Sequence, residues 1–139
     1  MYHSYFEYWE VKPHFTKEFI SLWSGWLRDE SYKLDLVTEK EWSRFNTLIK
    51  LIAIDFELKL ANCETETLDN ITDVNSVLDS YDVSMNKDSS KFTKLVIPKL
   101  DCVITEEWDY TYILWHKNSD VVEKLAPYIK RAQLKHFSN

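Results

Sequence analysis

The sequence predicts an α+β fold, with helices packed on a small antiparallel β-sheet in a single domain. Apolar residues recur at three- and four-residue steps through much of the first two thirds of the chain, as they do on one face of an amphipathic helix. Residues 92 to 115 are instead rich in the β-branched and aromatic residues typical of strands. We therefore expect helices mainly from the first two thirds to cover a sheet built from the last third.

The chain length supports a single domain spanning residues 1 to 139. A length of 139 residues suits one ordinary domain and is too short for two. The aromatic content of 15% can build a hydrophobic core without metal ions or disulfide bonds.

The first expected elements have ambiguous patterns. Residues 2 to 11 alternate in a way compatible with a strand, and a helix is nearly as plausible. After Pro13, apolar residues recur from Phe15 to Leu27 at helical spacing, which predicts a helix with one apolar face. Gly25 weakens this prediction, because glycine is a poor helix former.

The clearest helix start lies at Thr38. Its hydroxyl can accept from a backbone N–H in the first turn, while the side chain of Glu41 reaches back to the N–H of Thr38, which is a capping box. We expect one helix from here to about Leu60, because no turn residue divides it. Residues 51 to 60 also alternate as a strand would, so the second half stays open between helix and strand.

The later elements follow from spacing and residue type. Leu68 to Tyr81 step at helical intervals, which predicts a short amphipathic helix with acidic residues outside. Three strands are expected at residues 92 to 97, 102 to 105 and 110 to 115, with residues 106 to 109 forming a hairpin connection and Pro98 marking a strand end.

A final helix is expected after Ser119, which can cap it. Pro127 must kink this helix or divide it in two.

Acidic residues concentrate in the middle of the chain. Residues 1 to 60 contain ten acids and eight bases, residues 61 to 90 seven and one, and residues 91 to 139 six and eight. The middle segment alone, with seven acids minus one base, accounts for the net charge of −6. The isoelectric point of the chain is near 5.2, so the chain is anionic at neutral pH. We therefore expect DNA and RNA to be poor partners, and we expect the negative charge to attract a basic protein.

The sequence contains no motif for a cofactor or metal ion. A single glycine excludes the glycine-rich loops that bind phosphates and dinucleotides. Cys63 and Cys102 are too far apart for a paired zinc-binding motif, and the four histidines lack the i, i+4 spacing of metal ligands. We expect no cofactor, no metal, and buried or half-buried thiols.

The sequence also shows no sign of secretion or membrane insertion. Residues 1 to 12 lack the basic start and apolar core of a signal peptide. The longest apolar stretch, residues 48 to 56, is too short to span a bilayer. We therefore expect a soluble, cytoplasmic protein that does not contact a membrane.

These features predict a non-enzymatic binding protein that neutralises a basic partner. The small acidic immunity proteins and antitoxins of bacteria, which neutralise nuclease toxins, offer a parallel based on size, acidity and the absence of catalytic motifs. The expected contact residues in the acidic segment are Glu64, Glu66, Asp69, Asp73, Asp79 and Asp82. The expected contacts in the hairpin are Glu106, Glu107, Trp108 and Asp109, with Trp108 as an interface anchor.

Two alternatives remain open. Asp55, Glu57 and Lys59, with Asp35 upstream, would resemble the metal-binding signature of restriction-nuclease-like enzymes if they lay on a strand. A second enzyme form would use the hairpin carboxylates near Trp108 as an acid/base group, namely Glu106, Glu107 and Asp109. The chain could also be a structural subunit of a larger assembly, with a merely solvated acidic segment.

Overall fold

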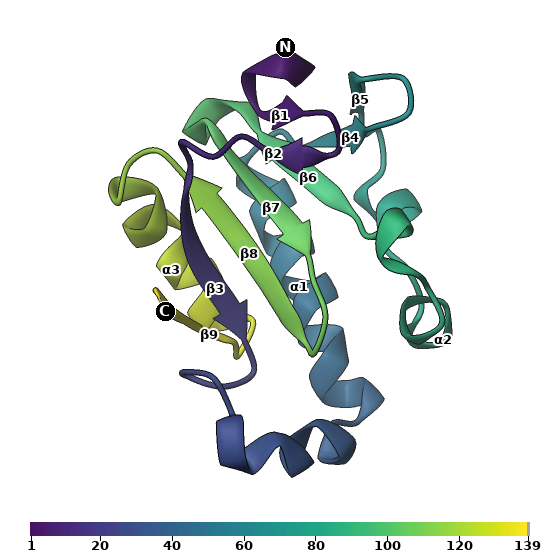
Figure 1. Cartoon of the computed structure of the whole chain (residues 1–139), viewed down its shortest axis with the longest axis vertical. Helices are drawn as coiled ribbons and strands as arrows, with labels where there is room; N and C mark the ends of the chain where they lie inside the picture. The colour runs from purple at the N-terminus through teal and green to yellow at the C-terminus, as the bar shows by residue number, and fades with distance from the viewer. Residues whose placement is uncertain (139) are drawn as a thin grey trace.

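A computed structural model, which describes residues 1 to 138, contains a seven-stranded antiparallel sheet (Figure 1). In sheet order the strands are β5 (Thr67–Asn70), β4 (Lys59–Asn62), β6 (Lys94–Ile97), β7 (Cys102–Glu106), β8 (Thr111–His116), β3 (Thr16–Ser21) and β9 (Lys135–Phe137). The predicted α+β fold is confirmed. The expectation that the sheet comes from the last third is wrong, because β3, β4 and β5 come from earlier in the chain.

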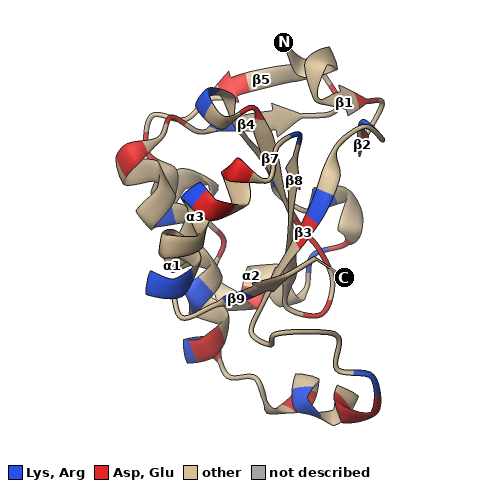
Figure 2. Ribbon diagram, turned by 90° about the vertical axis from the view of Figure 1, so that its left-hand side faces the viewer, with Lys and Arg blue, Asp and Glu red and all other residues tan. Residues whose placement is uncertain are grey.

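The helices α1 (Glu39–Asp55) and α3 (Asp120–Arg131) cover one face of the sheet (Figure 2). The main core lies between these helices and the sheet. Its fully buried side chains include Phe45 and Leu48 from α1, Leu125 from α3, and Ile104 and Leu114 from the sheet. Among residues 1 to 138, no helix is both long enough and apolar enough to cross a membrane.

The N-terminal segment covers part of the opposite face. It contains the turn η1 (Tyr2–Ser4) and a small hairpin formed by β1 (Phe6–Glu7) and β2 (Glu10–Val11). Its aromatic side chains pack against the sheet in a second buried cluster, made of Tyr2, Tyr5, Phe6, Phe15, Val96 and Val103. This segment lies at the same end of the molecule as β5 (Figure 1).

The predicted helix at residues 15 to 27 is wrong, because residues 16 to 21 form strand β3. Phe19 pairs with Ile113 of β8 on one side and with Phe137 of β9 on the other. A strand with a partner on each side satisfies its backbone donors and acceptors through the sheet, so tertiary pairing overrides the helical spacing. The chain then continues into the 3₁₀ segment η2 (Arg28–Leu36).

The predicted start of α1 is confirmed and its predicted end is wrong. The N–H of Thr38 donates to Oε1 of Glu41 at 3.3 Å, and the capping box forms. The helix ends at Asp55, and Phe56 has extended backbone angles. Leu60 pairs with Leu95 of β6, so sheet pairing converts the end of the predicted helix into β4.

The predicted amphipathic helix at residues 68 to 81 is also wrong. The region contains β5, the turn η3 (Val74–Val77) and the short helix α2 (Tyr81–Met85). The side chain of Asp73 accepts from the N–H of Asn75 at 3.0 Å, and that of Ser80 accepts from the N–H of Val83 at 3.3 Å. Side chains that bond the local backbone in this way begin new turns and interrupt a continuous helix.

The three strands predicted in the last third are confirmed as β6, β7 and β8, with a hairpin between β7 and β8. β6 ends at Ile97, and Pro98 begins the turn η5 (Pro98–Leu100). At the hairpin tip, Asp109 and Tyr110 have φ values of 59° and 55°. This is the left-handed conformation that glycine usually supplies in hairpins, so the chain forms the turn without it.

The final helix is confirmed, but its cap differs from the prediction. The side chain of Asn118, and not that of Ser119, accepts from the N–H of Asp120, at 2.9 Å. Pro127 lies inside α3 without dividing it. Its side chain is exposed, so water can bond the carbonyl that loses its helical donor.

The end of α3 forms a Schellman motif around a residue that is not glycine. The N–H of Leu134 donates to the carbonyl of Ile129 at 3.0 Å, and the N–H of Gln133 donates to that of Lys130 at 2.9 Å. Gln133 has a φ of 62° and an exposed side chain. Its Cβ is therefore strained without making a compensating buried contact.

We expect Gln133→Gly to raise the free energy of unfolding by about 0.5–1 kcal/mol, because glycine adopts positive φ without strain. Urea denaturation measures this change. The matched control, Lys130→Gly in the last turn of α3, should lower the free energy of unfolding by about 1 kcal/mol. A loss of stability in both variants would contradict this explanation of the helix end.

Candidate functional site

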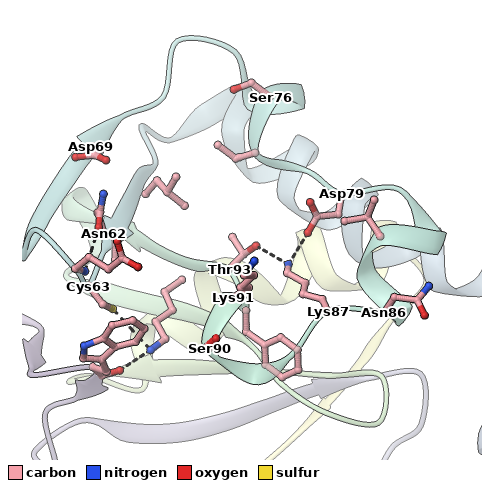
Figure 3. Close-up of a pocket in the computed structure, with 18 residues that line it drawn as sticks. Asn62, Cys63, Asp69, Ser76, Asp79, Asn86, Lys87, Ser90, Lys91 and Thr93 are labelled. Atoms are coloured by element: carbon pink, nitrogen blue, oxygen red, sulfur yellow. Dashed lines mark hydrogen bonds and ion pairs between the residues drawn. The ribbon is translucent and has the colours of Figure 1, made fainter.

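The acidic segment, residues 61 to 90, lies along one edge of the sheet and borders a broad hollow of about 690 Å³ (Figure 3). We call this space the edge hollow. It lies between β4, the turn after α2 and the start of β6. Its charged lining residues are Glu64, Asp69, Asp79, Lys87, Lys91 and Lys94. Three carboxylates and three ammonium groups therefore balance one another in the lining.

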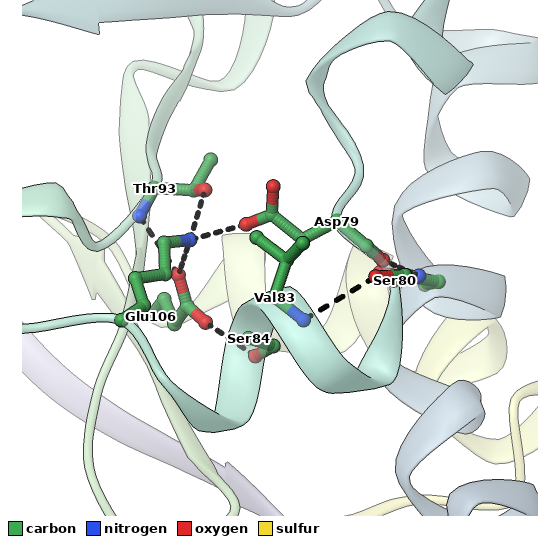
Figure 4. Close-up of polar contacts among 8 residues, drawn as sticks. Asp79, Ser80, Val83, Ser84, Thr93 and Glu106 are labelled. Carbon is green, nitrogen blue, oxygen red and sulfur yellow. Dashed lines mark hydrogen bonds and ion pairs between the residues drawn. The ribbon is translucent and has the colours of Figure 1, made fainter.

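Lys87, which lies beside Asp79 in the lining of the edge hollow (Figure 3), holds two carboxylates together. These are Asp79 and Glu106 (Figure 4). Its Nζ donates to Oδ2 of Asp79 at 2.5 Å and to Oε1 of Glu106 at 2.7 Å. The side chain of Lys87 is only 8% exposed and that of Glu106 only 10%. We call these three residues the Lys87 clamp. It joins the segment around α2 to the end of β7.

Lys87 stays protonated in this environment. Burial alone would lower the pKa of its amine, but the hydrogen bonds to Asp79 and Glu106 raise the pKa above its ordinary value of 10.5. A protonated amine that donates to two carboxylates has no free lone pair for nucleophilic attack. Its geometry fits a role in fixing the fold of the acidic segment.

Glu106 lies away from the exposed tip of the hairpin. It is the last residue of β7, and it also accepts from the N–H of Thr93 at 2.9 Å and from the hydroxyl of Ser84 at 3.2 Å. Both of its oxygens are thus engaged by neighbouring groups. The expectation that Glu106 is part of the hairpin turn is wrong, because its pairing with Tyr112 extends β7 by one residue.

The other predicted contacts of the acidic segment differ in their surroundings. Glu64 and Asp69 line the edge hollow, and Asp82 lies in the first turn of α2. Glu66 contacts the ring of His3, with Oε2 at 2.5 Å from Nε2. Asp73 caps η3 and lines a different hollow of about 290 Å³.

Exposed carboxylates outnumber exposed cations along this edge. In residues 61 to 93, Lys91 is the one cation with an exposed side chain. The exposed carboxylates are Glu64, Glu66, Asp69, Asp73, Asp82 and Asp88. Within residues 1 to 138, no ion pair involves Glu64, Asp69 or Asp82.

The remaining hairpin residues lie outside the edge hollow. Trp108 is 60% exposed, and its ring packs edge to face on Phe92 with centroids 4.8 Å apart. Glu107 accepts from the hydroxyl of Thr105 at 2.8 Å, and Asp109 is exposed. Phe92 also lines the edge hollow, so it connects the two groups of predicted contact residues.

The residues of the metal-dependent alternative are not brought together. Asp35 precedes α1 and Asp55 ends it, and a helix of 17 residues is about 25 Å long. Asp55 instead accepts from the hydroxyl of Tyr128 at 2.5 Å, while Glu57 lies in the short segment between α1 and β4, which Lys59 begins. Within residues 1 to 138, no group of three or more histidine, cysteine, aspartate or glutamate side chains is placed to hold a metal ion.

The two thiols have the predicted surroundings. Cys63 is half-buried and Cys102 is buried, and both are free. Burial raises the pKa of Cys102 to about 12, with a smaller contribution from Asp101. Cys102 is therefore a protonated core side chain at neutral pH.

Comparison of the chain with protein family models, with curated proteins and with solved structures gives no match. Its function is therefore inferred from the geometry of its own residues. Sequence reasoning missed the role of Lys87. The signal was present, because Lys87 is the only base among seven acids in residues 61 to 90.

We expect Lys87→Met to lower the free energy of unfolding by about 3 kcal/mol or more, because it leaves two carboxylates together in a largely buried site. Lys91→Met is the control, since Lys91 is exposed and should change stability by no more than about 0.5 kcal/mol. Urea denaturation at neutral pH compares the two variants. Equal and small decreases in the free energy of unfolding of the two variants would contradict this role of the Lys87 clamp.

The difference in stability between the wild type and Lys87→Met should depend on pH. Because folding raises the pKa of Lys87, the clamp contributes fully below the ordinary lysine value of 10.5 and is lost as the pH rises through the higher folded value. Denaturation at pH 8 and at successively more alkaline pH measures this difference. A difference that does not shrink at alkaline pH would argue against a charged Lys87.

We also expect millimolar Mg²⁺ or Mn²⁺ to leave the melting temperature unchanged, since the candidate ligands Asp35, Asp55 and Glu57 do not converge. Differential scanning fluorimetry with EDTA as the reference measures this. A specific rise in melting temperature, or metal-dependent cleavage of nucleic acid, would support the nuclease alternative.

Proposed function

We propose that this chain is a non-enzymatic protein that binds and neutralises a basic protein partner, as an immunity- or antitoxin-type inhibitor of a bacterial nuclease toxin. The observation that carries the proposal is the excess of exposed carboxylates along residues 61 to 93, where Lys91 is the one exposed cation. The hairpin residues Glu107, Trp108 and Asp109, which form no ion pair within residues 1 to 138, extend the proposed contact surface.

Electrostatics gives this edge a mechanism for capture. Like charges held on consecutive segments repel one another in the free protein, and a cationic partner relieves that repulsion. The attraction acts over about 10 Å at an ionic strength of 0.1 M, so it accelerates association before contacts form. Inhibition then follows if the chain occupies the basic surface with which a nuclease binds its own substrate.

The Lys87 clamp supports the proposal by limiting which carboxylates take part. Asp79 and Glu106 are neutralised within the protein, and their loss would disturb the fold. Glu64 and Asp82 have neither an ion pair nor a side-chain hydrogen bond within residues 1 to 138. These two residues therefore allow binding to be tested with the least disturbance of the fold.

We expect the double variant Glu64→Lys and Asp82→Lys to lower the association rate with the basic partner by about tenfold or more, because it reverses two charges on the capturing edge. The matched control is Asp120→Lys with Glu123→Lys, which makes the same charge change on α3, on the other side of the molecule (Figure 1). Immobilised wild type and both variants are compared for a protein retained from the native cell at a one-to-one ratio.

The retained protein should be basic, released by salt, kept by the α3 control and lost by the edge variant. The wild-type chain should also inhibit its activity. Retention that is equal in all three proteins, or an acidic partner, would overturn the proposal.

A further inference from the structure

Two exposed tryptophan rings are held in position by other aromatic rings. Trp26 is 44% exposed, and its ring packs edge to face on Phe19 and Phe137, with centroids 4.7 and 5.0 Å apart. Trp108 is 60% exposed and packs on Phe92. Exposed indoles that are already positioned by other rings lose little conformational entropy on binding, and tryptophan is enriched among binding hot spots.

Both indoles border one cleft. It has a volume of about 420 Å³ and lies between the segment after β3 and the β7–β8 turn. Phe19, Thr111 and Ile113 of the sheet also line it. A second hollow of about 340 Å³ adjoins it and shares Leu34 and Trp108 with it. We call the two together the tip cleft. Cavities of this size with apolar walls suit a single large side chain or a small ligand.

The charged groups of the tip cleft favour a cationic occupant. The cleft's carboxylate-bearing lining residues are Asp35, Glu106, Glu107 and Asp109, and within residues 1 to 138 only Glu106 among them has an ion pair, with Lys87. Arg28 is the one cation in the lining. Burial and a hydrogen bond to a neighbouring tyrosine raise the pKa of Tyr110 to about 12, and Asp109 and Asp35 add to this effect. Asp35, Asp109 and Tyr110 all line the second hollow.

We propose that the tip cleft binds an arginine side chain of the basic partner. The inference rests on the proposed function for the nature of that partner, and adds where and how one of its side chains is recognised. The planar guanidinium stacks on an indole ring and is attracted by the negative face of that ring. Its N–H groups can donate to Glu107 and Asp109 at the rim. A neutral side chain of the same shape would lose both attractions.

The experiment uses capped peptides and the indole N–H signals of the ¹⁵N-labelled chain. The probe is acetyl-Gly-Arg-Gly-amide, and the reference is the same peptide with citrulline, which keeps the shape of arginine without its charge. We expect the arginine peptide to shift the signals of Trp26 and Trp108 in a saturable way, with at least tenfold weaker binding of the citrulline peptide. Trp9, which is 44% exposed and lines the edge hollow, reports any binding of the peptide at the acidic edge instead.

The variants separate this inference from the proposed function. Glu107→Gln with Asp109→Asn should weaken binding of the arginine peptide about tenfold, whereas the edge variant Glu64→Lys with Asp82→Lys should leave it unchanged. Loss of partner capture with peptide binding intact would overturn the proposed function alone. Partner capture without any shift at Trp26 and Trp108 would overturn this inference alone.

Three further results would also overturn it: equal shifts from the arginine and citrulline peptides, equal shifts at Trp9, or shifts that depend on protein concentration without peptide. The last would mean that a second copy of the chain covers the cleft.

Discussion

The arrangement of the acidic segment depends on one buried cation. Lys87 joins Asp79, from the loop before α2, to Glu106, at the end of a central strand. Charges in such a poorly solvated place are tolerated only when they are paired and hydrogen-bonded, and Thr93 and Ser84 complete the set around Glu106. The clamp thus anchors a polar segment that contributes few side chains to the core. Because Lys87 pairs with Asp79, the least exposed carboxylate of the segment, and with Glu106, the unpaired negative charge of the segment lies on the exposed ones.

The way the two faces of the sheet are covered explains where the first hollow of the tip cleft lies, the one that Trp26 and Trp108 both border. Helices α1 and α3 cover one face completely enough that Leu114 and Leu125 have no exposed surface. The N-terminal aromatic segment covers only one part of the other face, over Val96 and Val103. The part near the β7–β8 turn is bordered instead by Trp26 and Trp108, which are held by other rings but remain in water. Burial of these exposed aromatic rings against a partner is more favourable than their contact with water, and the neighbouring carboxylates can pair with cations of that partner.

The sequence correctly predicted the elements that are formed by interactions between residues close together in the chain. The capping box at Thr38 begins α1, and the β-branched residues of 92 to 115 form three neighbouring strands. Helical spacing failed at β3, because Phe19 is paired on both sides by strands from the end of the chain. Long-range pairing of this kind leaves no periodic trace in a single sequence.

The candidate site could be predicted in part. The acidic composition identified the segment, and acids around Trp108 marked the hairpin tip, where the side chain is exposed. Composition could not distinguish Asp79 and Glu106, which are neutralised by Lys87, from Glu64 and Asp82, which are not. Trp26 belongs to the segment predicted as a helix from Phe15 to Leu27, whereas in the structure it follows β3 and borders the tip cleft.

The central claim is that exposed carboxylates on the acidic edge capture a basic protein. The most direct measurement is the association rate of the chain with its retained partner, followed by stopped-flow fluorescence over a series of ionic strengths. Electrostatic capture predicts a rate that falls about tenfold or more from low to physiological ionic strength, with a much smaller change in the dissociation rate. An association rate that is independent of ionic strength would contradict the claim.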